Sequence, residues 1–113
     1  MTIVTTPLPF STLQQMAAAG FGNMVKAVAD LARGRLAVDG ELHADLEAAL
    51  LEEGSQQSSL WGINLYPELS GDAFIEFDSM INLRPSQGNP SRGVDDPATR
   101  AAIRALVNRL VTR

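Results

Sequence analysis

The sequence contains no cysteine and only one histidine, His43. Without cysteine there is no disulfide framework, no thiolate zinc site and no cysteine nucleophile. A single histidine also excludes a multi-histidine metal site within one chain. We therefore predict a protein without a metal and without a cofactor.

Positive charge is scarce as well, because 9 lysines and arginines stand against 13 aspartates and glutamates, for a formal net charge of −4. Non-specific binding to nucleic acid requires basic charge, so we expect no nucleic-acid partner. The chain lacks the basic, apolar start of a signal peptide. It also lacks the run of roughly 20 apolar residues that spans a bilayer. We expect no membrane partner and a cytoplasmic location.

What remains is the composition of a globular protein. The chain has 113 residues, of which 45% are hydrophobic and 19% are charged, and this length suits one domain. We predict a single domain over residues 1–113, in which residues 1–10 form an extended lead-in. The predicted fold class is α+β, with a small, mostly antiparallel β-sheet of two hairpins and about three helices packed on one face.

Three stretches carry helix signals. The first follows Ser11, which stands in capping-box spacing to Gln14; the second has leucine at every fourth position; the third begins with Asp96 and Pro97. A capping residue, a four-residue apolar repeat and a proline at the first helical position each favour a helix. The sequence predicts helices over residues 12–19 and 44–53 and from residue 97 onward.

Residues 24–40 can be interpreted in two ways. Short apolar runs flank the turn signal at Arg33 and Gly34, which favours a β-hairpin. The alanine content and the spacing of apolar residues also suit one longer helix that ends near Ala32. We prefer the hairpin.

A second hairpin is the clearest strand signal. Residues 61–66 and 75–83 alternate between apolar odd positions and polar even positions, which places the two sets on opposite faces. The turn falls around Gly71. Folding the chain about this turn predicts four cross-strand neighbours: Gly62 with Asp78, Ile63 with Phe77, Asn64 with Glu76, and Leu65 with Ile75.

The most unusual segment joins this hairpin to the last helix. Residues 84–93 combine two arginines, four neutral hydrogen-bonding side chains and two glycines. Two arginines can grip an anion, and backbone N–H groups next to a helix start favour negative charge. No phosphate-binding signature is present, and the alternative is an ordered loop that satisfies its own backbone. The candidate ligand-binding residues, for a small anion, are Arg84, Ser86, Gln87, Asn89, Ser91 and Arg92.

The polar face of the second hairpin is another candidate site. On a regular strand Glu76 and Asp78 point the same way, so they could bind a divalent metal or act as an acid and base pair. The alternative is a solvated outer face, with Arg84 paired to one of these carboxylates. His43 could serve as a general base, although a capping or packing role is commoner. The polar-face candidates are His43, Asn64, Glu76, Asp78 and Asn82.

Three stretches of the chain resemble a known family. Residues 40–45 (GELHAD), residues 60–68 (LWGINLYPE) and the loop over 84–94 are similar to a family of small prokaryotic proteins known as a domain of unknown function. The resemblance extends from about residue 21 to about residue 110. Asp39 departs from the family, in which two successive glycines are common before the helix. The resemblance implies no activity and transfers no catalytic residue.

Three classes of function stay open. We prefer a non-catalytic binding or interaction module that self-associates as a homodimer, since two predicted helices carry apolar stripes and dimers are the commonest oligomers. The alternatives are a small hydrolase-like enzyme that uses the polar sheet face, and a regulatory partner of an operon-encoded protein pair. An enzyme requires polar groups that converge on a pocket.

Overall fold

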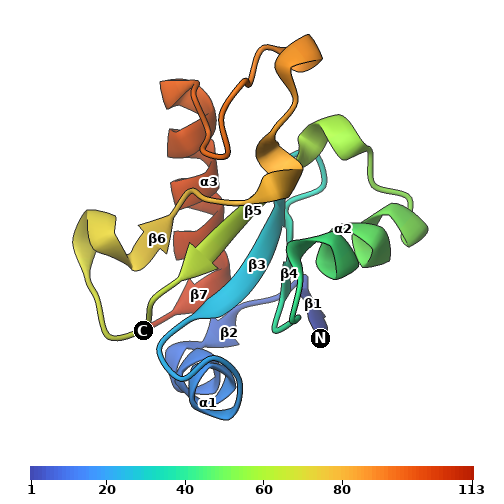
Figure 1. Cartoon of the computed structure of the whole chain (residues 1–113). Helices are drawn as coiled ribbons and strands as arrows, with labels where there is room; N and C mark the ends of the chain where they lie inside the picture. The colour runs from blue at the N-terminus through green and yellow to red at the C-terminus, as the bar shows by residue number, and fades with distance from the viewer.

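The structure, a computed structural model that describes all of residues 1–113, is built around a five-stranded sheet (Figure 1). All neighbouring strands in this sheet are antiparallel. The strands are, in spatial order, β1 (Thr2–Val4), β4 (Arg35–Val38), β3 (Val25–Asp30), β5 (Leu60–Leu65) and β6 (Ile75–Glu76). The α+β class, the mostly antiparallel sheet and the three helices are confirmed.

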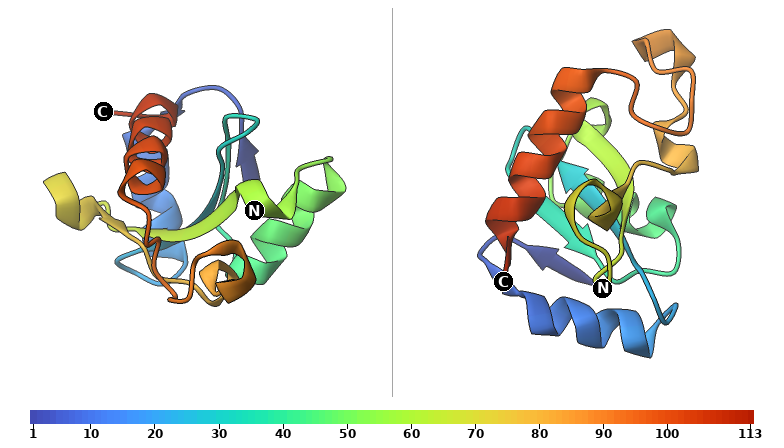
Figure 2. Two further views of the ribbon diagram at one scale, coloured as in Figure 1. Left: turned by 90° about the horizontal axis from the view of Figure 1, so that it is seen from above. Right: turned by 90° about the vertical axis from the view of Figure 1, so that its left-hand side faces the viewer.

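The helices cover both faces of the sheet, as Figure 2 shows, so the prediction that they lie on one face is wrong. Helices α1 (Phe10–Ala19) and α3 (Pro97–Leu110) lie on one side, and α2 (His43–Glu52) lies on the other. The reason is that the central strands are apolar on both faces, and each apolar face needs a covering layer. Val28 of β3, for example, packs with α2, whereas its neighbours on β3 belong to the opposite cluster.

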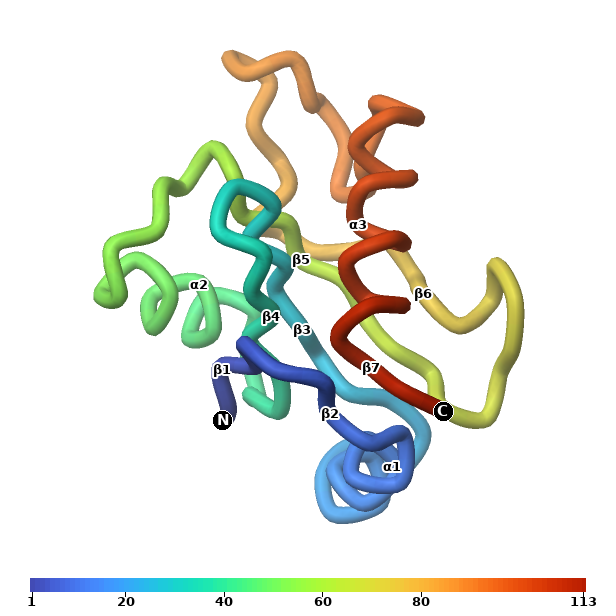
Figure 3. The backbone as a smooth tube through the Cα atoms, turned by 180° about the vertical axis from the view of Figure 1, so that it is seen from behind, coloured from blue at the N-terminus to red at the C-terminus, as the bar shows by residue number.

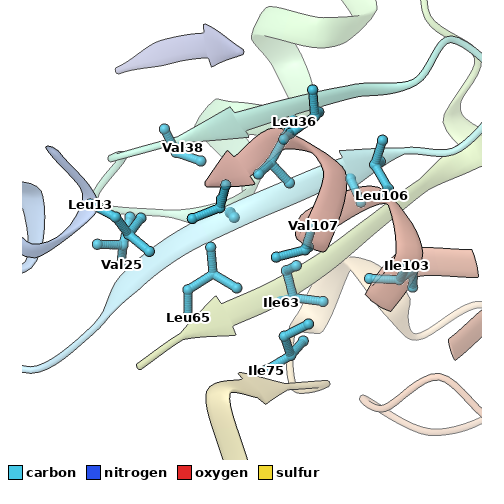
Figure 4. Packing of buried hydrophobic residues seen from close by; sticks show 14 of the residues in the cluster. Leu13, Val25, Leu36, Val38, Ile63, Leu65, Ile75, Ile103, Leu106 and Val107 are labelled. Atoms are coloured by element: carbon cyan, nitrogen blue, oxygen red, sulfur yellow. The ribbon is translucent and has the colours of Figure 1, made fainter. Parts of the chain in front are cut away.

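The larger core lies between the sheet and the pair α1 and α3. Figure 4 shows Val25 beside Leu13 of α1, and Ile63 beside Ile103 and Val107 of α3. These five side chains are almost completely buried. The smaller core, under α2, depends on Leu46 and Leu50, two members of the predicted leucine stripe. The third member, Leu42, precedes the helix and is 56% exposed.

Residues 1–9 precede α1 and are part of the fold, and Phe10 already belongs to the helix. Besides β1, they contain β2 (Leu8–Pro9), which pairs in parallel with β7 (Val111–Thr112). Figure 3 shows these two segments side by side, so the beginning and the end of the chain are fastened together. None of the helices combines the length and apolar character needed to cross a bilayer.

The helix boundaries follow the sequence signals with one exception. Asp96 accepts a hydrogen bond from the Ala98 N–H and Pro97 is the first residue of α3, both as predicted. Gly20 ends α1, also as predicted. The capping box at Ser11 is wrong, because α1 begins at Phe10 directly after β2 and has no side-chain cap. Pairing of Pro9 with β7 therefore decides where this helix starts.

The first hairpin is confirmed, and the longer helix up to Ala32 is wrong. Strands β3 and β4 pair in antiparallel fashion, with Asp30 opposite Arg35. Gly34 adopts φ 65° in the connecting turn, a conformation that glycine reaches without steric cost. Strand β3 also pairs with β5 on its other side, so its apolar residues gain more contacts as a central strand than as a helix.

The second hairpin is confirmed only next to its turn. Asn64 lies opposite Glu76 and Leu65 opposite Ile75, as predicted. The strand ends there, so the predicted pairs of Ile63 with Phe77 and Gly62 with Asp78 are wrong. Residues 77–83 stay beside β5 without strand pairing and contain a short 3-10 helix, Met80–Asn82. The other short 3-10 helices are Gln57–Ser59, Gly71–Phe74 and Pro85–Gln87.

Asn82 takes the place of the missing strand. Its Oδ1 accepts a hydrogen bond from the Gly62 N–H at 2.8 Å, and its Nδ2 donates to the Gly62 carbonyl at 2.9 Å. One buried side-chain amide thus satisfies the two backbone groups of β5 that a longer β6 would have paired. Asn82 is completely buried, so it supports the sheet and is not a member of an exposed polar face.

Candidate functional site

The 84–93 loop is held from within by Arg84. This side chain is only 6% exposed, and its two terminal nitrogens donate to the carbonyls of Gln57, Leu60 and Ile81. Its guanidinium also lies over the Trp61 ring, 4.2 Å from the centroid. Burial lowers the pKa of Arg84, opposed by the negative charge of Glu47. Arg84 therefore joins the start of β5 to the loop and does not present its charge to a ligand.

Asn89 organises the rest of the loop. Its Nδ2 donates to the carbonyls of Asn82 and Gly93, both at 2.8 Å, and its Oδ1 accepts from the Asp95 N–H. Ser91 bridges the same segment, since its hydroxyl donates to Asp95 and accepts from the Gly93 N–H. These contacts support the alternative of an ordered loop that satisfies its own backbone.

The remaining loop candidates do not supply a free cation. Arg92 forms an ion pair with Asp78, with 2.8 Å between its Nε and the carboxylate oxygen. Ser86 and Gln87 are exposed. The predicted grip of an anion by Arg84 and Arg92 together finds no support, because one arginine is buried and the other is already paired. The pairing of Arg84 with Glu76 or Asp78 is also wrong.

Three polar side chains form a row across neighbouring strands on the α2 side of the sheet. Lys26 of β3 lies opposite Asn64 of β5, which lies opposite Glu76 of β6. The Glu76 carboxylate accepts from Asn64 Nδ2 at 2.8 Å and from the Tyr66 hydroxyl at 3.0 Å. Burial, together with the hydrogen bond and charge of Glu76, raises the pKa of Tyr66. Lys26, Asn64 and Glu76 are called the polar row below.

Glu76 and Asp78 do not form a carboxylate pair. Because β6 ends at Glu76, the period-two geometry stops there, and Asp78 turns to Arg92. No three His, Cys, Asp or Glu side chains come close enough together to hold a metal ion. The hypothesis of a metal or an acid and base pair on these two residues is therefore not supported by their placement.

His43 lies at the first position of α2, next to the polar row. Its Nε2 is 2.8 Å from the Ile63 carbonyl oxygen. A carbonyl only accepts, so Nε2 carries the proton and Nδ1 has a free lone pair. Burial lowers the pKa of His43, the hydrogen bond to the Ile63 carbonyl opposes this effect, and the positive charge of Lys26 adds to it. His43 is thus a neutral imidazole near neutral pH, as a packed polar side chain.

This burial predicts a pH dependence of stability. Because folding lowers the pKa of His43 below its ordinary 6.5, the unfolded chain binds more protons than the folded chain in the window beneath that value. The free energy of unfolding should therefore fall as the pH drops below about 6.5 and level off below the folded pKa. Urea unfolding of the native protein and of His43→Gln, at several pH values across this window, checks the prediction. The variant should lack this part of the slope, and equal slopes would contradict it.

A groove of about 670 Å³ lies at the end of the sheet nearest to the carboxyl end of α1. It lies between α1, the start of β3 and the turn that precedes α2. Below it is called the Phe21–Leu42 groove, after two side chains that are 49% and 56% exposed. Its lining residues are Met16, Ala19, Gly20, Phe21, Met24, Val25, Lys26, Asp39, Gly40, Glu41 and Leu42.

Lys26 belongs to both the groove and the polar row. Its ammonium lies over the Phe21 ring, 5.1 Å from the centroid, and forms no ion pair. The Lys26 carbonyl accepts from the Asp39 N–H at 3.1 Å, so two walls of the groove are joined there. Asp39 adopts φ 67°, a region that favours glycine.

The sequence candidates therefore divide into separate groups. His43, Asn64 and Glu76 lie around the polar row, whereas Asn82, Arg84 and Asn89 are buried supports of the loop. None of these candidates lines the groove. Sequence reasoning missed the groove because Leu42 was assigned to a helix stripe. One sequence signal could have indicated the groove: the aromatic residue Phe21 stands between two glycines directly after the predicted end of a helix.

Comparison with known proteins gives one match. A family model described as Protein of unknown function (DUF5674) matches residues 2–110 of the 113-residue chain. This range contains the three stretches that carry the resemblance, and the resemblance is confirmed. No curated protein matches the chain, and no solved structure matches it.

Proposed function

Because this chain belongs to the family described as Protein of unknown function (DUF5674), its function has to be inferred from its own residues, and we propose that it is a non-catalytic binding protein. The observation that carries the proposal is the Phe21–Leu42 groove. Its volume of about 670 Å³ is within the usual range for small-molecule sites. Large apolar side chains left half-exposed around a hollow are typical of a binding site.

The lining of the groove supports a ligand that is apolar in its body and charged at both ends. The apolar walls come from Met16, Phe21, Met24 and Leu42. Lys26 supplies one positive charge, whereas Asp39 and Glu41 supply negative charge, and none of the three has an ion-pair partner. A zwitterion with an apolar side chain, such as an apolar amino acid or a dipeptide, complements both the walls and the charges.

Lys26 is the residue that would bind the carboxylate of the ligand. With its ammonium over the Phe21 ring, Lys26 has a preferred position, and its positive charge lacks a carboxylate partner within the protein. The polar row continues from Lys26 to Asn64, whose Oδ1 is buried without a hydrogen-bond partner. Asn64 itself does not line the groove, so Lys26 is the member of the polar row that a ligand in the groove would contact.

A hydrolase-like enzyme is the alternative, and it depends on different residues. It would use the polar row and His43, whose free Nδ1 could accept a proton. His43 and Glu76 do not line the groove, which favours binding over catalysis. Substitution separates the two: His43→Gln and Glu76→Gln should leave ligand binding in the groove within about twofold, a change below 0.5 kcal/mol.

Titration calorimetry tests the proposal with leucine, phenylalanine and the dipeptide Leu-Phe, each also as its N-acetylated and C-amidated form. We expect saturable binding of the zwitterions, and about tenfold weaker binding to Lys26→Met and to Leu42→Ala. Leu83→Ala is the matched control, because Leu83 is a leucine of similar exposure, 45%, outside the groove. The N-acetylated forms should bind weakly because they cannot satisfy Asp39 and Glu41.

Failure of every zwitterion to saturate the protein at about 10 mM would overturn the proposal. Stronger binding of the C-amidated forms would instead show that the groove selects cations. The homodimer stays a prediction, and sedimentation of the native protein tests it. A dimer that Leu42→Lys dissociates would mean that a second copy occupies the groove, and the small-ligand proposal would then be wrong.

A further inference from the structure

A second cavity lies on the α3 side of the molecule, beside β6. It has a volume of about 460 Å³ and lies between the turn before β6 and the carboxyl-terminal half of α3. Arg104, Asn108 and Arg113 contribute to one wall, and Ser70 and Gly71 contribute to the other. Arg104 and Asn108 are four residues apart on a helix, so they share a face. This cavity shares no residue with the groove.

Aromatic rings position the two arginines. The Arg104 guanidinium lies 5.1 Å from the centroid of Phe77. The Arg113 guanidinium lies 4.3 Å from the centroid of Phe10 and 4.7 Å from that of Phe74. A cation over an aromatic face is stabilised by the ring without giving up its N–H donors. Both guanidinium groups are therefore placed while their hydrogen-bonding capacity stays available.

Neither arginine is committed to a protein acceptor. Arg84 and Arg100 donate to backbone carbonyls, and Arg92 has a carboxylate partner. Arg104 and Arg113 have neither a side-chain hydrogen bond nor an ion pair, although Asp72 also lines the cavity. In a chain with a net charge of −4, this cavity thus has two unpaired guanidinium groups and one carboxylate, that of Asp72.

We propose that this cavity binds a small molecule through a phosphate group. Each guanidinium presents N–H donors in a planar fork that matches the oxygens of a phosphate. Asn108 adds an amide donor, and the backbone at Gly71 has φ 60° with open space beside its Cα. The cavity is larger than one phosphate group requires, which leaves room for an organic part. This proposed anion site is separate from the one expected at residues 84–93.

Calorimetry and NMR titration at low ionic strength test this site with inorganic phosphate, methyl phosphate and pyrophosphate, and with succinate as a carboxylate probe. We expect saturable binding in the order pyrophosphate, methyl phosphate, succinate. Arg104→Gln and Arg113→Gln should each weaken pyrophosphate binding at least tenfold, a loss of about 1.4 kcal/mol. Asp72→Asn should strengthen it, because Asp72 repels the ligand.

Arg109→Gln is the matched control. It removes the same charge from the same helix, and Arg109 is exposed and does not line the cavity. Its pyrophosphate affinity should stay within about twofold of the native value, and Phe21→Ala should leave it unchanged. Absence of saturable binding, or an equal loss in Arg109→Gln, would overturn the site. Succinate binding as tightly as pyrophosphate would overturn the choice of phosphate.

Discussion

Replacement of Arg84 by methionine should lower the free energy of unfolding by about 3 kcal/mol, because a buried charged donor that serves several carbonyls is lost. Methionine fills part of the space beside Trp61, but it cannot donate to the carbonyls of Gln57, Leu60 and Ile81. These acceptors would be left without their partner in a region that water reaches poorly. Arg84→Lys should recover only part of the loss, since one ammonium cannot reproduce the planar fork.

Arg92→Met is the matched control for this result. Arg92 stands in the same loop, but its side chain is 53% exposed and its ion pair with Asp78 is on the surface. Such pairs contribute about 0–1 kcal/mol, so this variant should unfold almost as the native protein does. Urea unfolding of the three variants compares them directly. If Arg84→Met were as stable as Arg92→Met, the buried contacts of Arg84 would not support the fold.

The contrast between these two arginines shows what the sequence could predict about the loop. Its richness in hydrogen-bonding side chains was plain, and an ordered loop was one of the two interpretations. The sequence did not show which of these side chains point into the protein and which point to solvent. Arg84 is buried because acceptors 24 and 27 residues earlier in the chain reach it, and no local pattern encodes a contact of that separation.

The sheet was predictable where its pattern was local. Turn chemistry at Gly34 and period-two alternation around Asn64 predicted both hairpins, and two of four cross-strand pairs were correct. The prediction failed beyond Glu76, although residues 77–83 keep the alternation. There the Asn82 side chain forms the hydrogen bonds to the Gly62 backbone that a longer β6 would have formed. This replacement does not alter the alternation of apolar and polar residues, so the sequence pattern could not reveal it.

Both candidate binding sites lay outside the motifs that sequence reasoning selected. The groove depends on Leu42 standing one residue before α2, and helix boundaries are uncertain by more than that from sequence alone. The α3 cavity depends on Arg104 and Arg113 lacking acceptors while rings hold them in place. An arginine on a helix or at a chain end is usually solvated, and only the rings packed against Arg104 and Arg113 distinguish these two.

The close packing of β5 against residues 77–83 leads us to expect a second large loss of stability, at Gly62. A Cβ atom at this position would lie 2.5 Å from the Ser79 Cβ and 3.0 Å from Ile81 Cγ1. Hydrogen bonds between the Gly62 backbone and the Asn82 side chain hold Gly62 in place. The Ser79 N–H donates to the Arg92 carbonyl, which fixes the Ser79 backbone. Neither side can move freely, so Gly62→Ala should destabilise the protein by about 3 kcal/mol through overpacking.

A double-mutant cycle with Ser79→Gly identifies steric conflict as the cause. Ser79→Gly alone should destabilise the protein moderately, because the Ser79 hydroxyl accepts from the Ile81 N–H. Combined with Gly62→Ala, it removes the Cβ that the new methyl group would meet. The double variant should therefore be more stable than the sum of the single effects by at least about 1 kcal/mol. Additive losses in urea unfolding would show that the close approach of Gly62 to Ser79 does not limit this position.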